Sequence, residues 1–134
     1  MSQENYSGKK PVLIVEDIAV NRDLFSLQLL HFGLATQHAR NGRDALELVQ
    51  ADPQAFSMIL MDLQMPVMDG ITATQLIRQD EINTNRHIVI VALTANDTPG
   101  IQEQCLQAGM DDFINKPVTL DKLNDVLTKW LTDS

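Results

Sequence analysis

The sequence predicts an α/β domain in which a doubly wound, five-stranded parallel sheet carries helices on both faces. Five strand-length segments alternate along the chain with five amphipathic segments of helical length. Three of the strand segments are almost wholly apolar, as strands are when helices cover both faces of a parallel sheet. At 134 residues the chain is long enough to bury one core without disulfides.

The predicted strands differ in how apolar they are. Residues 12–15, 57–61 and 87–93 form nearly continuous apolar runs, which is typical of central strands. Residues 35–39 and 112–115 mix polar with apolar side chains, which suits strands at or near an edge. The first, third and fourth strands are therefore expected inside the sheet.

Five predicted helices follow these strands, and residues that commonly start or end helices bound several of them. The predicted helices cover residues 20–32, 41–51, 71–80, 99–108 and 120–131. Gly33 and Pro53 follow the first two helices, where such residues end helical structure. Thr98 is expected to cap the fourth helix, which has Pro99 in its first turn and ends at Gly109.

Composition limits the setting and the partners. The formal net charge of -8 disfavours phosphate backbones and anionic lipid surfaces as general partners. Cys105 is the only cysteine, so no internal disulfide can form and a reducing, cytoplasmic setting is expected. Residues 1–10 are polar and are expected to be flexible, with one domain over residues 11–134. The domain either acts alone or belongs to a longer chain.

Candidate chemical groups follow four of the predicted strands. Glu16 and Asp17 follow the first strand, Asp62 the third, Thr94 the fourth and Lys116 the fifth. The carboxyl ends of parallel strands share one edge of the sheet, where ligands bind. Three carboxylates close together repel unless a cation lies between them, and Mg²⁺ prefers such oxygen ligands. The lysine would suit an oxyanion such as a phosphoryl group.

Each of these residues also has a simpler explanation. Glu16 and Asp17 could cap the first helix, and Asp62 could be an ordinary turn residue. Thr94 could be a β-branched strand end, and Lys116 a solvated loop charge. Taken singly these explanations nearly suffice. Four such coincidences at four different strand ends are much less probable.

The motifs around these residues resemble the receiver domain of two-component response regulators. They are Val-Glu-Asp at 15–17, Met-Asp-Leu-Gln-Met-Pro-Val-Met-Asp-Gly at 61–70, Leu-Thr-Ala at 93–95 and Asn-Lys-Pro at 115–117. The resemblance covers about residues 11–131, and details near the first and second strands are most similar to receivers of hybrid histidine kinases. It implies a flavodoxin-like (βα)5 fold with strand order 2-1-3-4-5.

The resemblance also implies a role for each site residue. Asp62 would accept a phosphoryl group from a phosphohistidine. Asp17 and Asp62 would bind Mg²⁺, with Glu16 acting through a bound water and the Gln64 backbone carbonyl as a further ligand. Lys116 would pair first with Asp62 and then with a phosphoryl oxygen.

A conformational switch is expected to follow phosphorylation. Thr94 would hydrogen-bond another phosphoryl oxygen, and Phe113 would swing inward into the space it leaves. The bond between Lys116 and Pro117 would be cis. Gln64 and Asn96 resemble the variable positions that tune hydrolysis of the aspartyl phosphate.

The expected partner is a histidine kinase or a histidine phosphotransfer protein, and the resemblance also allows a homodimer. An aspartate-based phosphatase would need a second aspartate where Gln64 stands. A flavin carrier is disfavoured because Glu16 and Asp17 would repel the flavin phosphate. An interaction module that works without phosphorylation is the alternative function that the sequence leaves open.

Overall fold

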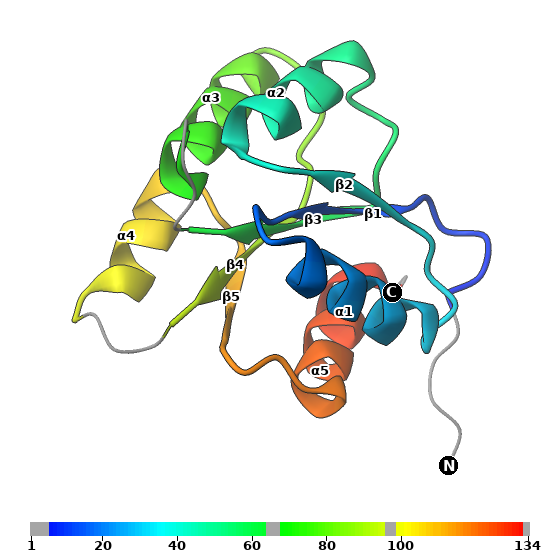
Figure 1. Ribbon diagram of the computed structural model, residues 1–134. Helices are drawn as coiled ribbons and strands as arrows, with labels where there is room; N and C mark the ends of the chain where they lie inside the picture. The colour runs from blue at the N-terminus through cyan, green and yellow to red at the C-terminus, as the bar shows by residue number, and fades with distance from the viewer. Residues whose placement is uncertain (1–5, 64–67, 96–98, 133–134) are drawn as a thin grey trace.

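A parallel five-stranded sheet forms the centre of the computed structural model, which describes residues 6–63, 68–95 and 99–132 (Figure 1). Its strands are β1 (Val12–Val15), β2 (Thr36–Ala39), β3 (Met58–Asp62), β4 (Ile90–Thr94) and β5 (Asp112–Asn115). They lie in the order β2-β1-β3-β4-β5, and every neighbouring pair is parallel. The predicted doubly wound fold, its strand order and its two mixed edge strands are confirmed.

Helices cover both faces of the sheet. They are α1 (Ala19–Leu30), α2 (Gly42–Ala51), α3 (Gly70–Glu81), α4 (Ile101–Ala108) and α5 (Leu120–Leu131). Figure 1 shows α1 and α5 on one face, with α2, α3 and α4 on the other. Within the described ranges, none of these helices has the length and apolar character needed to cross a membrane.

Alternation along the strands divides the core into two layers. Val12 and Ile14 pack with residues of α1 and α5, whereas Leu13 and Val15 pack with residues of α2, α3 and α4. Successive strand residues point to opposite faces, so one apolar run supplies both layers. This arrangement explains why the central strands are apolar without interruption.

Two elements start two or more residues later than the sequence predicts. β4 begins at Ile90 rather than at residue 87, because the Ile88 N–H donates to the Glu81 carboxylate (2.8 Å) and not to a neighbouring strand. α4 begins at Ile101 rather than at residue 99, because Gly100 has a φ of 79° and cannot continue a right-handed helix. The predicted Thr98 cap lies outside the described residues.

Part of the N-terminal segment packs against the domain. Tyr6 is buried in the layer beneath α1 and α5, and its N–H donates to the carbonyl of Phe32 (2.9 Å). Flexibility was predicted for residues 1–10, of which residues 1–5 lie outside the described ranges. Among the described residues, the packed chain therefore begins at Tyr6.

Candidate active site

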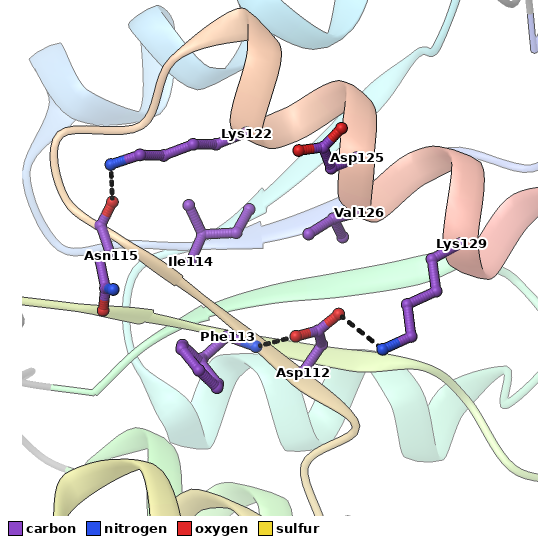
Figure 2. Close-up of a pocket in the computed structure, with 8 residues that line it drawn as sticks. All are labelled: Asp112, Phe113, Ile114, Asn115, Lys122, Asp125, Val126 and Lys129. Carbon is purple, nitrogen blue, oxygen red and sulfur yellow. Dashed lines mark hydrogen bonds and ion pairs between the residues drawn. The ribbon is translucent and has the colours of Figure 1, made fainter.

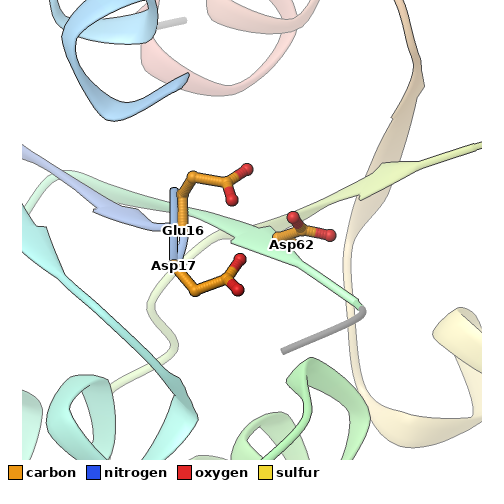
Figure 3. Close-up of side chains that lie close together, drawn as sticks. All are labelled: Glu16, Asp17 and Asp62. Atoms are coloured by element: carbon orange, nitrogen blue, oxygen red, sulfur yellow. The ribbon is translucent and has the colours of Figure 1, made fainter. Parts of the chain in front are cut away.

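Three carboxylates meet at the carboxyl edge of the sheet. Glu16 and Asp17 follow β1, and Asp62 is the last residue of the neighbouring strand β3. One oxygen from each lies within 4.8 Å of the others, and Figure 3 shows the three side chains close together. The sequence-predicted acidic residues are thus brought together by the pairing of β1 with β3.

The electrostatics of these acids favour a bound cation. Glu16 is completely buried, and this burial, reinforced by the nearby Asp62 carboxylate, raises the pKa of its carboxyl from 4.5 to about 7. The Ile18 N–H donates to Glu16 Oε2 (3.1 Å), and this hydrogen bond lowers the pKa of the carboxyl. Within the described part of the chain, no donor reaches Glu16 Oε1. An all-oxygen set with a buried, unsatisfied carboxylate oxygen fits a hard divalent cation.

Lys116 brings a positive charge to Asp62. Its Nζ lies 3.3 Å from Asp62 Oδ2, and the side chains are 36% and 7% exposed respectively. Lys116 directly follows β5. Its backbone N–H donates to the Thr94 carbonyl on β4 (2.7 Å), which holds it beside that strand. The bond between Lys116 and Pro117 is cis, as the resemblance implied.

Thr94 ends β4 beside this group and is almost completely buried. Its hydroxyl donates to Asn115 Oδ1, at 2.8 Å, on the adjacent strand β5. Sequence reasoning gave Asn115 no role. The available signal was its position directly before Lys116, but a contact with Thr94 follows only from the strand register.

Phe113 lies on the same strand, two residues before Asn115. It packs against the core layer of α2, α3 and α4, and it lines a pocket of about 310 Å³ between β5 and α5 (Figure 2). Asp112, the residue before Phe113, points toward α5 and accepts a hydrogen bond from Trp130 Nε1 (2.8 Å). The predicted switch residues Thr94 and Phe113 therefore belong to adjacent strands at one end of the sheet.

Arg22 is a second residue that sequence reasoning missed. It projects from α1 back to the β1–α1 connection, where its Nη1 donates to the Glu16 carbonyl (2.9 Å). Ile18, the residue before α1, forms no side-chain capping bond. Arg22 thus tethers the acidic connection from within the helix, a contact that no local sequence pattern predicts.

Gly70 lets α3 begin directly against the aspartate strand. A Cβ at this position would lie 2.5 Å from the Asp62 carbonyl oxygen and 2.8 Å from Met61 Cγ. The preceding residue, Asp69, caps the helix by accepting a hydrogen bond from the Thr72 N–H (2.7 Å). The predicted Gln64 carbonyl ligand and the Asn96 position lie outside the described residues.

The fold and the site together define a class of protein: a flavodoxin-like domain with a metal-fitting acidic group, a lysine and a threonine at one sheet edge. Residues 12–128 match the response regulator receiver domain family. The chain is 39% identical over 123 residues to hybrid signal transduction histidine kinase A of Dictyostelium discoideum, covering 91% of this chain and 6% of that protein. The chain belongs to the response regulator receiver domain family.

Solved structures agree with this assignment. The Saccharomyces cerevisiae Ssk1 receiver domain, co-crystallised with the histidine phosphotransfer protein Ypd1, aligns with a TM-score of 0.83 and 32% identity. That alignment covers 93% of this chain and 90% of the other. The receiver of the Arabidopsis thaliana histidine kinase CKI1, complexed with Mg²⁺ and BeF₃⁻, aligns with a TM-score of 0.83 and 31% identity, covering 95% and 92%.

Proposed function

We propose that this domain is a phosphorylation-dependent signalling switch that accepts a phosphoryl group from a phosphohistidine onto Asp62. The observation that carries the proposal is the position of Asp62 between two other acids and the Lys116 ammonium. Among the three acids, Asp62 is the one that ends a strand and forms a described ion pair with Lys116. Asp62 is therefore assigned as the nucleophile.

The reaction exchanges one bond to phosphorus for another. A carboxylate oxygen of Asp62 forms a bond to phosphorus while the phosphorus–nitrogen bond of the phosphohistidine breaks and its electron pair returns to the imidazole. Glu16, Asp17 and Asp62 would hold Mg²⁺, which supplies positive charge to the phosphoryl oxygens when bound. Lys116 lies where it can move from the Asp62 oxygen to a phosphoryl oxygen.

Phosphorylation would then change the end of the sheet. The aspartyl phosphate adds negative charge and acceptor oxygens at the end of β3. Thr94 on the adjacent strand would donate its hydroxyl to one of these oxygens, and Phe113 on β5 would move inward. This two-state change would carry the signal to another domain or protein.

The partner would dock on the exposed apolar face of α1. Five large apolar side chains are between 49% and 74% exposed on α1 and its preceding residue: Ile18, Val20, Leu24, Leu27 and Leu30. This α1 apolar face begins directly after Asp17, beside the site. Large exposed apolar patches mark protein interaction sites. We assign it to the histidine-bearing partner, since the similar Ssk1 receiver was crystallised with a histidine phosphotransfer protein.

The chain spans only 6% to 7% of the length of two hybrid signal transduction proteins of Dictyostelium discoideum that it matches. The stimulus and the output of any larger protein are not assigned by the site. What the site supports is the acceptor reaction itself, because the three acids and Lys116 all belong to this domain.

Incubation with Mg²⁺ and acetyl phosphate tests the proposed function. Intact mass measurement should show one phosphoryl adduct on the native domain, and the adduct should be absent from Asp62→Asn. Omission of Mg²⁺, with a chelator present, should also abolish the adduct. A native domain that takes no phosphoryl group under these conditions would instead support an interaction module that works without phosphorylation.

A further inference from the structure

The hydroxyl of Thr94 already has a partner in this structure. Thr94 and Asn115 are register partners on the parallel strands β4 and β5, so their side chains stand side by side on one face of the sheet. Thr94 Oγ1 donates to Asn115 Oδ1 at 2.8 Å, and Thr94 is almost completely buried. The bond therefore has an ordinary length, and its donor is shielded from water.

A threonine hydroxyl has only one proton to donate. While that proton is shared with Asn115, it cannot also be donated to an oxygen of a phosphoryl group on Asp62. The two hydrogen bonds are thus mutually exclusive. Thr94 must release Asn115 before it can perform the role that the proposed function gives it.

Backbone contacts hold Asn115 in place on both sides. The Lys122 ammonium donates to the Asn115 carbonyl at 3.0 Å, as Figure 2 shows, and the adjacent Lys116 N–H donates to the Thr94 carbonyl at 2.7 Å. Asn115 is thereby tied to α5 and to β4 through its backbone. Rotation of the Thr94 side chain would break the side-chain bond while these backbone contacts persist.

We propose that Asn115 is a positioning residue that holds Thr94 in its resting orientation and sets how readily the domain enters its phosphorylated conformation. The inference rests on the proposed function, and it adds a residue that opposes the switch. Asn115 is also two residues from Phe113 and shares its face of β5, since alternate strand residues point the same way. Loss of the Thr94 bond would therefore alter the same face of β5 that carries Phe113.

Binding of beryllofluoride in the presence of Mg²⁺ measures this effect. Asn115→Ala should bind beryllofluoride about 2- to 10-fold more tightly than the native domain, which is the range for one lost hydrogen bond of the resting state. In a Thr94→Ala background the same Asn115 substitution should change the affinity by less than about 1.5-fold, because the shared bond no longer exists. Phe113 ring resonances of free Asn115→Ala should shift toward their beryllofluoride-bound positions.

Asn124→Ala is the matched control, because Asn124 is a half-buried asparagine on α5 whose Oδ1 accepts no hydrogen bond within the described residues. It should leave the affinity unchanged. Thermal unfolding checks each variant. If Asn115→Ala does not fold, Asn115→Ser replaces it, because serine is too short to reach Thr94.

The outcomes separate this inference from the proposed function. A native domain that binds no beryllofluoride overturns both. If the native domain binds it, an equal or weaker affinity in Asn115→Ala overturns the inference alone. An equal effect of Asn115→Ala with and without the Thr94 hydroxyl also overturns it, since the asparagine would then act by another route.

Discussion

Lys116 Nζ lies 3.3 Å from Asp62 Oδ2, so one ion pair joins the end of β5 to the end of β3 across the intervening strand β4. The aspartate is nearly buried, whereas the lysine is partly open to solvent. The lysine therefore has more room to change partners than the aspartate. The ion pair places a partly exposed positive charge next to the carboxylate proposed as the nucleophile.

Removal of that charge should slow phosphorylation strongly. Lys116→Met should reduce the rate of phosphorylation by acetyl phosphate about 100-fold, the typical loss when one stabilising donor is removed from a developing charge. The rate is measured by intact mass at saturating Mg²⁺. Lys129→Met is the control, because Lys129 is an exposed lysine that lies 3.8 Å from Asp112 on β5. A Lys116→Met rate within a few-fold of the native rate would contradict the assigned role.

The buried Glu16 predicts an unusual dependence of stability on pH. Its folded-state pKa of about 7 exceeds the ordinary value of 4.5, so between these values the folded state binds more protons than the unfolded state. The stabilising contribution is therefore complete below about pH 4.5 and is lost as the pH rises through about 7. Without Mg²⁺, the free energy of unfolding should fall over this window by about 1–3 kcal/mol relative to Glu16→Gln.

Urea unfolding of both proteins at pH 5 and pH 7.5, with a chelator, measures the difference. The comparison with Glu16→Gln removes the contribution of all other titrating groups. Added Mg²⁺ should stabilise the native domain at pH 7.5, because a ligand that binds only the folded state raises the free energy of unfolding. Parallel pH profiles for the two proteins would show that Glu16 titrates normally.

Alanine at position 70 should destabilise the domain. Replacing glycine with alanine near a helix start is ordinarily neutral or favourable, since it restricts the unfolded chain. At Gly70 the added Cβ would meet the Asp62 carbonyl oxygen at 2.5 Å, so α3 or β3 must shift. We expect a loss of about 1–3 kcal/mol in the free energy of unfolding, as for other overpacked sites. Urea unfolding measures it.

The same substitution should slow phosphorylation, because the shift occurs at the backbone of Asp62, the proposed nucleophile. Gln75→Ala, an exposed change on the same helix, should alter neither quantity. Equal stability of Gly70→Ala and the native domain would mean that α3 moves away without resistance.

A charge introduced on the α1 apolar face should slow phosphorylation by a protein donor but not by a small-molecule donor. Leu24→Glu should slow phosphoryl transfer from a phosphorylated histidine phosphotransfer protein by more than about 10-fold, because a desolvated interface disfavours an unpaired charge. Its reaction with acetyl phosphate should stay unchanged, since that donor needs no docking surface. Leu106→Glu, at a comparably exposed leucine on α4, is the control. Equal loss with both donors would indicate damage to the site instead.

The sequence predicted the strands and the acidic edge because both follow from local patterns. Apolar runs that stop at charged residues mark the carboxyl ends of strands, and parallel pairing then brings Glu16 and Asp62 together. The late starts of α4 and β4 have local physical causes. Gly100 adopts a left-handed conformation, and the Glu81 side chain replaces a strand partner at Ile88.

Contacts between elements could not be predicted in the same way. The bond from Thr94 to Asn115 depends on the register of β4 with β5, which the sequence pattern does not specify. The tether from Arg22 to the Glu16 carbonyl depends on where one long side chain turns back from its helix. Asn115 and Arg22 are found only from the three-dimensional arrangement, whereas the residues proposed to react are found from sequence.

The hydrogen bond from Trp130 Nε1 to Asp112 gives the domain an internal optical probe. Trp130 is the only tryptophan of the chain, and Asp112 immediately precedes Phe113 on β5. The indole therefore senses the strand from the α5 side while Phe113 faces the opposite layer. Movement of β5 should change the polarity around the indole and hence its emission. Ordinary fluorescence could then follow the domain's conformational change in real time, without any attached label.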